Sequence, residues 1–292
     1  MTEFHSGEEL LKLCIEKNKS ISQIVIEGEM ELTEQSLEDI MSKMKNSLEV
    51  MRHSINEGLE EDIKSVSGMI GGEAKKMKKF FKNHISISGE NMIEAVSAAL
   101  AVTEVNGAMG QIVAAPTAGS CGIIPGTLLT SAERLKACDE DIIKALFTAA
   151  GIGNIITQNA TVAGAEGGCQ AETGSAAAMA AAGIVELAGG TPEQALHAAA
   201  MTIKNILGLV CDPIAGLVEA PCSKRNAIGT ANALICVDMA LAGIKSIIPF
   251  DEVVEAMYKV GRSLPYELRE TALGGLAATP TGKRLQKEIF GQ

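Results

Sequence analysis

From residue 91 onward the sequence is a succession of helix patterns rich in Ala, Gly and short apolar residues, with no run of alternating strand residues. Hydrophobic residues make up 47% of the chain, yet aromatic residues make up 3% and Trp is absent. A core with so few rings must be filled by Ala, Leu, Ile, Val and Met. Because Ala, Leu and Met favour helices and small residues let helices approach closely, the sequence predicts an all-α fold, an Ala/Gly-rich helical bundle with Gly-rich loops that form the site.

Capping residues mark several helix starts. The segment Thr191-Pro192-Glu193-Gln194 combines an N-cap Thr, a Pro at the first helical position and a Gln that completes a capping box. Asp139 and Asp251 are expected to cap two further helices. Thr33 is expected to cap a helix whose apolar positions recur from Leu37 to Leu59.

The first 90 residues carry more charge than the rest of the chain. They are expected to form helices with a break at residues 68–72, while two β-branched pieces, residues 21–26 and 85–87, are compatible with short strands. No linker is long enough to force a division. We therefore expect a single domain over residues 1–292, in which residues 1–90 pack onto a core formed by residues 91–292.

Charge and hydropathy limit the partners of this chain. The net charge of −11 disfavours binding to nucleic acid, because an acidic surface repels phosphate groups. The N-terminus lacks a basic start followed by an apolar stretch, and the most apolar region, residues 174–190, contains Glu186 and is too short to span a bilayer. We expect a cytoplasmic protein without membrane association, whose seven cysteines are free or bind metal.

Four Gly-rich, polar segments interrupt the helices and form the candidate site. They cover residues 115–122, 159–172, 211–226 and 274–282. Such loops on a rigid scaffold commonly carry binding and catalytic groups. Cys169, Cys211 and Cys222 lie in these loops beside Gly or Pro, and thiolates hold iron–sulfur clusters or zinc. Their spacing matches no generic zinc finger, so spacing alone leaves the kind of metal open.

Three segments carry a resemblance to a known family. They are G-G-C-Q-A-E at residues 167–172, C-D-P-I-A-G-L-V-E-A-P-C at residues 211–222 followed by K-R-N at residues 224–226, and P-T-A-G-S at residues 116–120. The chain resembles the iron–sulfur L-serine dehydratases, specifically the α subunit of the two-chain form, from about residue 20 to Phe290 and Gly291. The resemblance implies that Cys169, Cys211 and Cys222 hold a [4Fe–4S] cluster.

The resemblance also implies an activity, the deamination of L-serine to pyruvate and ammonia in serine catabolism. Three cysteine ligands leave one iron with an open position, and such an iron can act as a Lewis acid on the serine hydroxyl. Pyridoxal phosphate is not expected, because the Ser-x-Lys-x-Arg-Gly segment of the pyridoxal enzymes is absent.

Further roles are assigned within the loops. Hydroxyls and backbone N–H groups at residues 117–120 suit a carboxylate, especially if a helix starts near Gly122, and an arginine can clamp a carboxylate with two bonds. The predicted catalytic residues are Ser120, Thr117 and Asn159, and the predicted substrate-binding residues are Gly119, Lys224, Arg225 and Asn226. Each has a structural alternative: an ordinary Pro-Thr turn, a solvated basic turn, or loop capping.

The general base is not visible, because none of the four His lies in a Gly-rich segment. The resemblance implies that a Ser-His-Thr motif on a separate β subunit completes the enzyme, so a β-subunit partner is expected. No cysteine follows Cys236, so the open iron is expected to be left to water or substrate. Two alternatives stay open: an open-site iron–sulfur hydro-lyase of another hydroxy acid, and a non-catalytic helical subunit stabilised by zinc.

Overall fold

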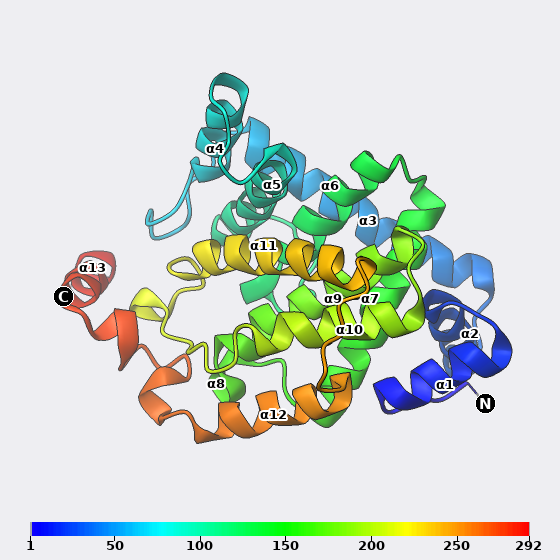
Figure 1. The fold of residues 1–292 in the computed structure, drawn as a ribbon. Helices are drawn as coiled ribbons and strands as arrows, with labels where there is room; N and C mark the ends of the chain where they lie inside the picture. The colour runs from blue at the N-terminus through cyan, green and yellow to red at the C-terminus, as the bar shows by residue number, and fades with distance from the viewer. Residues whose placement is uncertain (1, 292) are drawn as a thin grey trace.

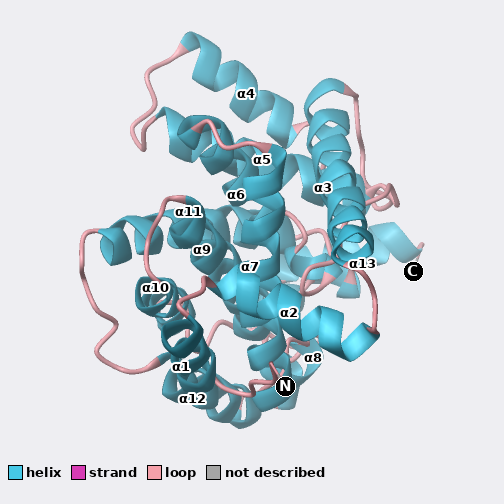
Figure 2. Ribbon diagram, turned by 90° about the vertical axis from the view of Figure 1, so that its right-hand side faces the viewer, coloured by secondary structure: helices cyan, strands magenta, loops and turns pink. Residues whose placement is uncertain are grey.

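The computed structural model describes residues 2–291, and all regular elements in that range are helical (Figures 1 and 2). The predicted all-α fold is confirmed. The α-helices are α1 (Gly7–Lys17), α2 (Ile21–Thr33), α3 (Leu37–Glu60), α4 (Glu73–Asn83), α5 (Glu90–Gly107), α6 (Ile123–Leu135), α7 (Asp139–Asn159), α8 (Gly164–Gly167), α9 (Ser175–Leu187), α10 (Pro192–Lys204), α11 (Cys222–Leu241), α12 (Phe250–Ser263) and α13 (Pro280–Phe290). Short helical turns lie at Ala118–Ser120, Gln170–Gly174, Ile214–Gly216, Tyr266–Leu268 and Gly275–Ala278.

Helix α9 lies at the centre of the bundle. Its residues from Ser175 to Val185 are buried, and it packs against α6, α7, α10 and α11 (Figure 1). Small residues make this close packing possible. A Cβ atom at Gly183 would lie 2.6 Å from the carbonyl oxygen of Ala145 on α7, so the two helices touch where a larger side chain could not fit. The Ala-rich composition thus accounts directly for the tight core.

The N-terminal helices share this core. Phe4, Leu10, Ile24 and Leu48 belong to the same buried apolar cluster as Ile152 of α7. This shared core supports the predicted packing of residues 1–90 onto the rest, although the single-domain organisation stays a prediction. Among the residues that the structure describes, no helix is long and apolar enough to cross a membrane.

Residues 21–26 do not form a strand but open helix α2, so that interpretation is wrong. Ser20 is the N-cap, and Ser20 and Gln23 form a capping box. Ile21 and Ile24 are buried at helical spacing, which shows how a β-branched run can join a helix once its start is capped. Residues 85–87 lie in the loop between α4 and α5, so they form no strand either.

The predicted helix caps have mixed outcomes. The capping box at Thr191 is confirmed at the start of α10. Thr33 is the last residue of α2, and the N-cap of α3 is Ser36, whose hydroxyl accepts a bond from the backbone N–H of Asp39 at 3.1 Å. Asp139 is the first residue of α7 rather than its cap.

Asp251 caps a different helix from the one expected. It lies inside the first turn of α12, and its carboxylate accepts bonds from the backbone N–H groups of Gly7 at 2.6 Å and Glu8 at 3.0 Å. These groups are unpaired donors at the start of α1, so Asp251 satisfies them from a distant part of the chain. The sequence cannot show this contact, because it depends on how α1 and α12 pack.

Candidate active site

The Gly-rich loops that carry the three cysteines meet at one end of the bundle. Cys222 is the first residue of α11, and Cys211 lies in the loop that precedes this helix. Cys169 follows α8 and is succeeded by a π-helical turn at Gln170–Gly174. In Figure 1 this end lies on the left, where the start of α11, the α8 turn and the chain between α12 and α13 come together. Single π-helical turns occur often at functional sites.

The three thiols are buried and close enough to interact. Cys169, Cys211 and Cys222 are 4%, 3% and 7% exposed, and all are free of disulfide bonds. Burial, with a smaller effect from the neighbouring Cys169, raises the pKa of Cys222 to about 12. Burial, together with Glu172, Cys169 and Cys222, raises the pKa of Cys211. The fold therefore brings the three predicted ligands together from two Gly-rich segments, residues 159–172 and residues 211–226.

Backbone bonds fix the Cys211 loop against the chain that follows α12. The N–H of Cys211 donates to the carbonyl of Leu268 at 2.9 Å, and the N–H of Glu270 donates to the carbonyl of Cys211 at 2.6 Å. The neighbouring Asp212 accepts a bond from the N–H of Leu276 at 2.6 Å. These bonds set the position of Cys211 relative to residues 268–276.

A second anchor joins the cysteine loop to the N-terminal part. Glu219 lies between Cys211 and Cys222 and is buried. It accepts bonds from the hydroxyl of Ser65 at 2.5 Å, from the N–H of Ser67 at 3.2 Å and from the hydroxyl of Ser67. The segment between α3 and α4 thus holds the loop on its other flank.

Arg225 lies beside the cysteines, and two of its N–H groups bind the loop that carries Cys211. Nη1 donates to the carbonyl of Val210 at 2.8 Å, and Nη2 donates to Oδ1 of Asp212 at 2.7 Å. Although burial lowers it, the pKa of Arg225 is raised, because Cys169 and Asp212 lie near the guanidinium. This geometry suits a residue that positions the loop and balances thiolate charge. No contact in the structure supports the predicted role of Arg225 in binding a substrate carboxylate.

The predicted Thr117–Ser120 loop lies against the cysteine loops. The hydroxyl of Thr117 donates to Oε1 of Glu172 at 2.8 Å, and the hydroxyls of Thr117 and Ser120 are 3.4 Å apart. Helix α6 begins at Ile123, with Gly122 as its N-cap, so a helix does start where the carboxylate-binding hypothesis needs one.

Asn226 attaches this loop to α11. Its Nδ2 donates to the carbonyls of Gly119 at 2.7 Å and Cys222 at 2.9 Å, and its Oδ1 accepts from the N–H of Gly122 at 3.0 Å. Asn226 is fully buried, and its amide is occupied by the backbone. It holds the Gly119 loop next to Cys222, while its predicted contact with substrate stays untested.

Two residues predicted to belong to the site, Asn159 and Lys224, direct their side chains to partners away from the cysteines. The amide of Asn159 donates to the carbonyls of His5 at 2.6 Å and Ile155 at 2.9 Å, which matches the loop-capping alternative. The ammonium of Lys224 pairs with Glu73, and its side chain is 58% exposed. No contact supports a catalytic or binding role for either residue.

Glu172 is a residue that the sequence interpretation did not single out. It lies three residues after Cys169 on the π-helical turn, and it is buried between the Thr117 and Cys211 loops. Burial raises its pKa. The sequence could have indicated Glu172, because residues three apart on a helical turn share a face and Cys169 is three residues before it. Thr173, four residues after Cys169, likewise lies with its hydroxyl 3.1 Å from the Cys169 sulfur.

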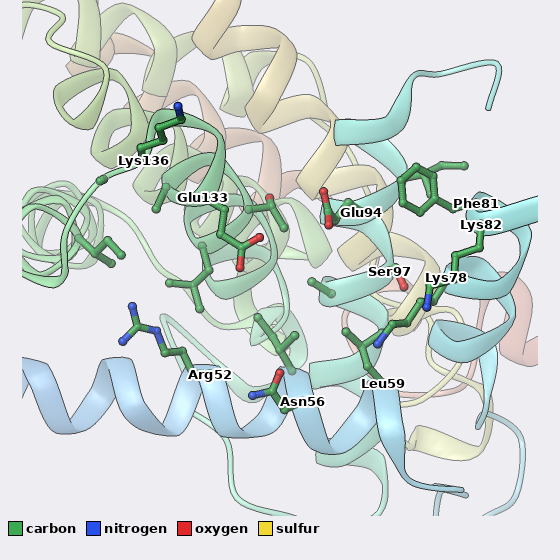
Figure 3. Close-up of a pocket in the computed structure, with 18 residues that line it drawn as sticks. Arg52, Asn56, Leu59, Lys78, Phe81, Lys82, Glu94, Ser97, Glu133 and Lys136 are labelled. Carbon is green, nitrogen blue, oxygen red and sulfur yellow. The ribbon is translucent and has the colours of Figure 1, made fainter. Parts of the chain in front are cut away.

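One pocket between the helices lies away from this site. It has a volume of about 430 Å³ between α3, α4, α5 and α6, and Figure 3 shows Glu94 and Glu133 among its charged side chains, with Arg52 and Asn56 below them. None of its lining residues belongs to the Gly-rich loops. Across residues 2–291, no three His, Cys, Asp or Glu side chains converge closely enough to hold a single metal ion.

Comparison with known proteins decides the family. The model of the serine dehydratase alpha chain matches residues 16–277. This chain belongs to the serine dehydratase alpha chain family. The resemblance noted in the loop motifs is therefore confirmed.

Several family members are similar over nearly the whole chain. The probable L-serine dehydratase alpha chain of Bacillus subtilis (strain 168) is 54% identical over 288 residues, which cover 99% of this chain and 96% of that protein. The L-serine dehydratase alpha chain of Peptoniphilus asaccharolyticus is 47% identical over 286 residues, covering 98% of each chain. L-serine dehydratase 1 of Escherichia coli (strain K12) is 38% identical over 285 residues, covering 94% of this chain but 61% of that longer protein.

Proposed function

We propose that this chain is the catalytic α subunit of a cytoplasmic L-serine dehydratase, which converts L-serine to pyruvate and ammonia. Its cofactor would be a [4Fe–4S] cluster held by Cys169, Cys211 and Cys222. The observation that carries the proposal is the meeting of these three buried thiols, from two Gly-rich segments, in a member of the serine dehydratase alpha chain family.

The donor set fits such a cluster. Three buried thiols with raised pKa values would lose their protons only if positive charge came close to them. Arg225 is the cation that interacts with Cys169 and Cys222, and it also pairs with Asp212. An iron–sulfur cluster would supply the rest of the positive charge. Since its cysteines bind different irons, their sulfurs need not converge on one point.

When bound, a cluster with three protein ligands would supply a Lewis-acidic iron that stabilises negative charge on the leaving hydroxyl oxygen. The residues of this chain would bind and orient the substrate. Thr117, Gly119 and Ser120 would receive the carboxylate, while Asn226 holds their loop in place. Loss of the Cα proton and of hydroxide from Cβ gives aminoacrylate and water. Aminoacrylate tautomerises to an imine, and hydrolysis of the imine yields pyruvate and ammonia.

We further propose that a β subunit supplies the general base. Within residues 2–291, the imidazole side chains of His5, His53, His84 and His197 form their hydrogen bonds and ion pairs with residues outside the cysteine loops. The names of the relatives call them alpha chains, and this chain matches 61% of the longer L-serine dehydratase 1. Both facts support a partner that contributes the missing part of the site.

The test is anaerobic reconstitution with iron and sulfide, in complex with the partner chain. We expect L-serine to give pyruvate and ammonia, and exposure to air to abolish turnover. Full activity in an iron-free complex would refute the mechanism. A substrate panel with malate and citrate separates the proposal from a hydro-lyase of another hydroxy acid.

A further inference from the structure

We propose that Glu172 binds the α-ammonium group of L-serine and so selects an amino acid over a hydroxy acid. The inference rests on the proposed serine dehydratase activity and adds a specificity-determining residue to it. It is drawn from the position of the Glu172 carboxylate between the two loops that form the site.

The carboxylate of Glu172 bridges the cysteine loop and the Thr117–Ser120 loop. Oε1 accepts the hydroxyl of Thr117 at 2.8 Å, and Oε2 lies 3.8 Å from the sulfur of Cys211. Two glycines make room for it. A Cβ atom at Gly119 would lie 2.8 Å from Oε1, and one at Gly164 would lie 2.7 Å from Oε2. The backbone of the Thr117–Ser120 loop and the backbone of α8 therefore pack directly on this carboxylate.

Glu172 is buried, with 9% of its surface exposed, and no cationic side chain among the described residues pairs with it. The nearby Arg225 forms its ion pair with Asp212 instead. A buried carboxylate without a counter-charge is unfavourable, because it has lost its hydration. The Glu270 carboxylate lies near enough to add further negative charge around it. The site therefore favours a ligand that brings a positive group to this place.

The stereochemistry of an α-amino acid matches this arrangement. Its carboxylate and ammonium are attached to the same carbon, so the groups that bind them must be neighbours. Thr117 and Glu172 are direct neighbours, joined by a hydrogen bond. A carboxylate bound by the Thr117–Ser120 loop would therefore place the ammonium within reach of Glu172. No hydrogen bond joins the Glu270 carboxylate to that loop, which makes Glu270 the weaker candidate.

The same charge would disfavour hydroxy acids. A hydroxyl in place of the ammonium leaves Glu172 without a counter-charge. A second carboxylate, as in malate or citrate, would be repelled by it. Selection for serine over hydroxy acids would thus follow from one buried charge.

The test compares L-alanine with L-lactate, which differ in the ammonium and cannot undergo β-elimination. Their dissociation constants are measured by calorimetry on the anaerobic, cluster-loaded complex with its partner chain. We expect L-alanine to bind at least about tenfold more tightly, as for one charge-assisted hydrogen bond. Glu172→Gln should reduce this preference to about threefold or less, with iron content unchanged. Glu166→Gln, at an exposed position of the same segment, is the matched control and should keep the preference.

Two results would overturn the inference: no preference for L-alanine in the unaltered complex, or an undiminished preference in iron-loaded Glu172→Gln. If Glu172→Gln loses iron, Glu172→Asp replaces it, since it keeps the charge and should keep a preference for L-alanine; loss of preference there contradicts the proposal. Failure of the proposed function looks different, because the unaltered complex would then form no pyruvate from L-serine.

Discussion

Arg225 and Asp212 form a buried ion pair, with Nη2 of Arg225 2.7 Å from Oδ1 of Asp212, beside the three cysteines. Their side chains are 13% and 3% exposed. The second carboxylate oxygen of Asp212 accepts the N–H of Leu276, so one residue links α11 to the chain before α13. The pair fixes the loop that carries Cys211.

Breaking the ion pair between Arg225 and Asp212 should lower the stability of the folded chain. Asp212→Asn leaves the Arg225 guanidinium buried without its counter-charge, so we expect a loss of about 3–5 kcal/mol in the free energy of unfolding. Denaturant unfolding of the apo chain measures it. Asp139→Asn is the matched control, because it breaks the exposed pair with Arg52 and should cost about 1 kcal/mol or less. Equal effects of the two variants would contradict this account of the loop.

Gly164 should tolerate no side chain next to the site. In Gly164→Ala the new Cβ would lie 2.7 Å from Oε2 of Glu172 and 2.9 Å from the sulfur of Cys211, so both groups must move. We expect about tenfold faster loss of iron to a chelator, as for disturbed neighbours of metal ligands. In Gly174→Ala the new Cβ would lie 3.5 Å from its nearest neighbour, Cδ1 of Ile206, and Gly174 has helical backbone angles, so iron retention should not change.

Replacing any of the three loop cysteines should remove iron from the protein, whereas replacing the exposed Cys138 should not. Single Cys→Ser changes at Cys169, Cys211 or Cys222 are expected to abolish iron retention, because each would remove one thiolate ligand. Cys138→Ser, at the N-cap of α7, should retain all its iron, since this thiol is exposed and bonds only to Asp141. Iron analysis of the anaerobic proteins checks both. Normal iron in any one of the three loop variants would remove that residue from the ligand set.

Glu104 should make stability depend on pH. It is fully buried, and burial raises its pKa above the ordinary value of 4.5, although the N–H groups of Glu73 and Ala74 donate to it. A carboxyl whose pKa is raised by folding contributes stability that is full below pH 4.5 and is lost as the pH rises through the folded value. The fall in Tm between pH 5 and pH 8 should therefore be smaller in Glu104→Gln than in the unaltered apo chain. An equal fall in both would contradict this role.

Local sequence patterns predicted some of the interactions that lie within one turn of the chain. The capping box at Thr191 needs only residues 191–194, and it forms as predicted. The same rule explains why Glu172 could have been identified, since it lies three residues after Cys169. The error at Thr33 arose because Ser36, three residues on, is an equally good cap, and the chain uses it.

Contacts between distant segments could not be predicted. Asn226 was expected to contact substrate because it lies near Cys222, but its amide is held by the backbone of Gly119 and Gly122. Arg225 was expected to be a free clamp, yet it is paired with Asp212. Each result depends on which loops meet, and a single sequence does not contain that information.

Chemical analysis of the anaerobically purified complex tests the central claim most directly. We predict a brown protein with about four irons and four acid-labile sulfides per α chain, consistent with a [4Fe–4S] cluster. A colourless complex that contains zinc, or that turns over L-serine while free of iron and sulfide, would contradict the claim.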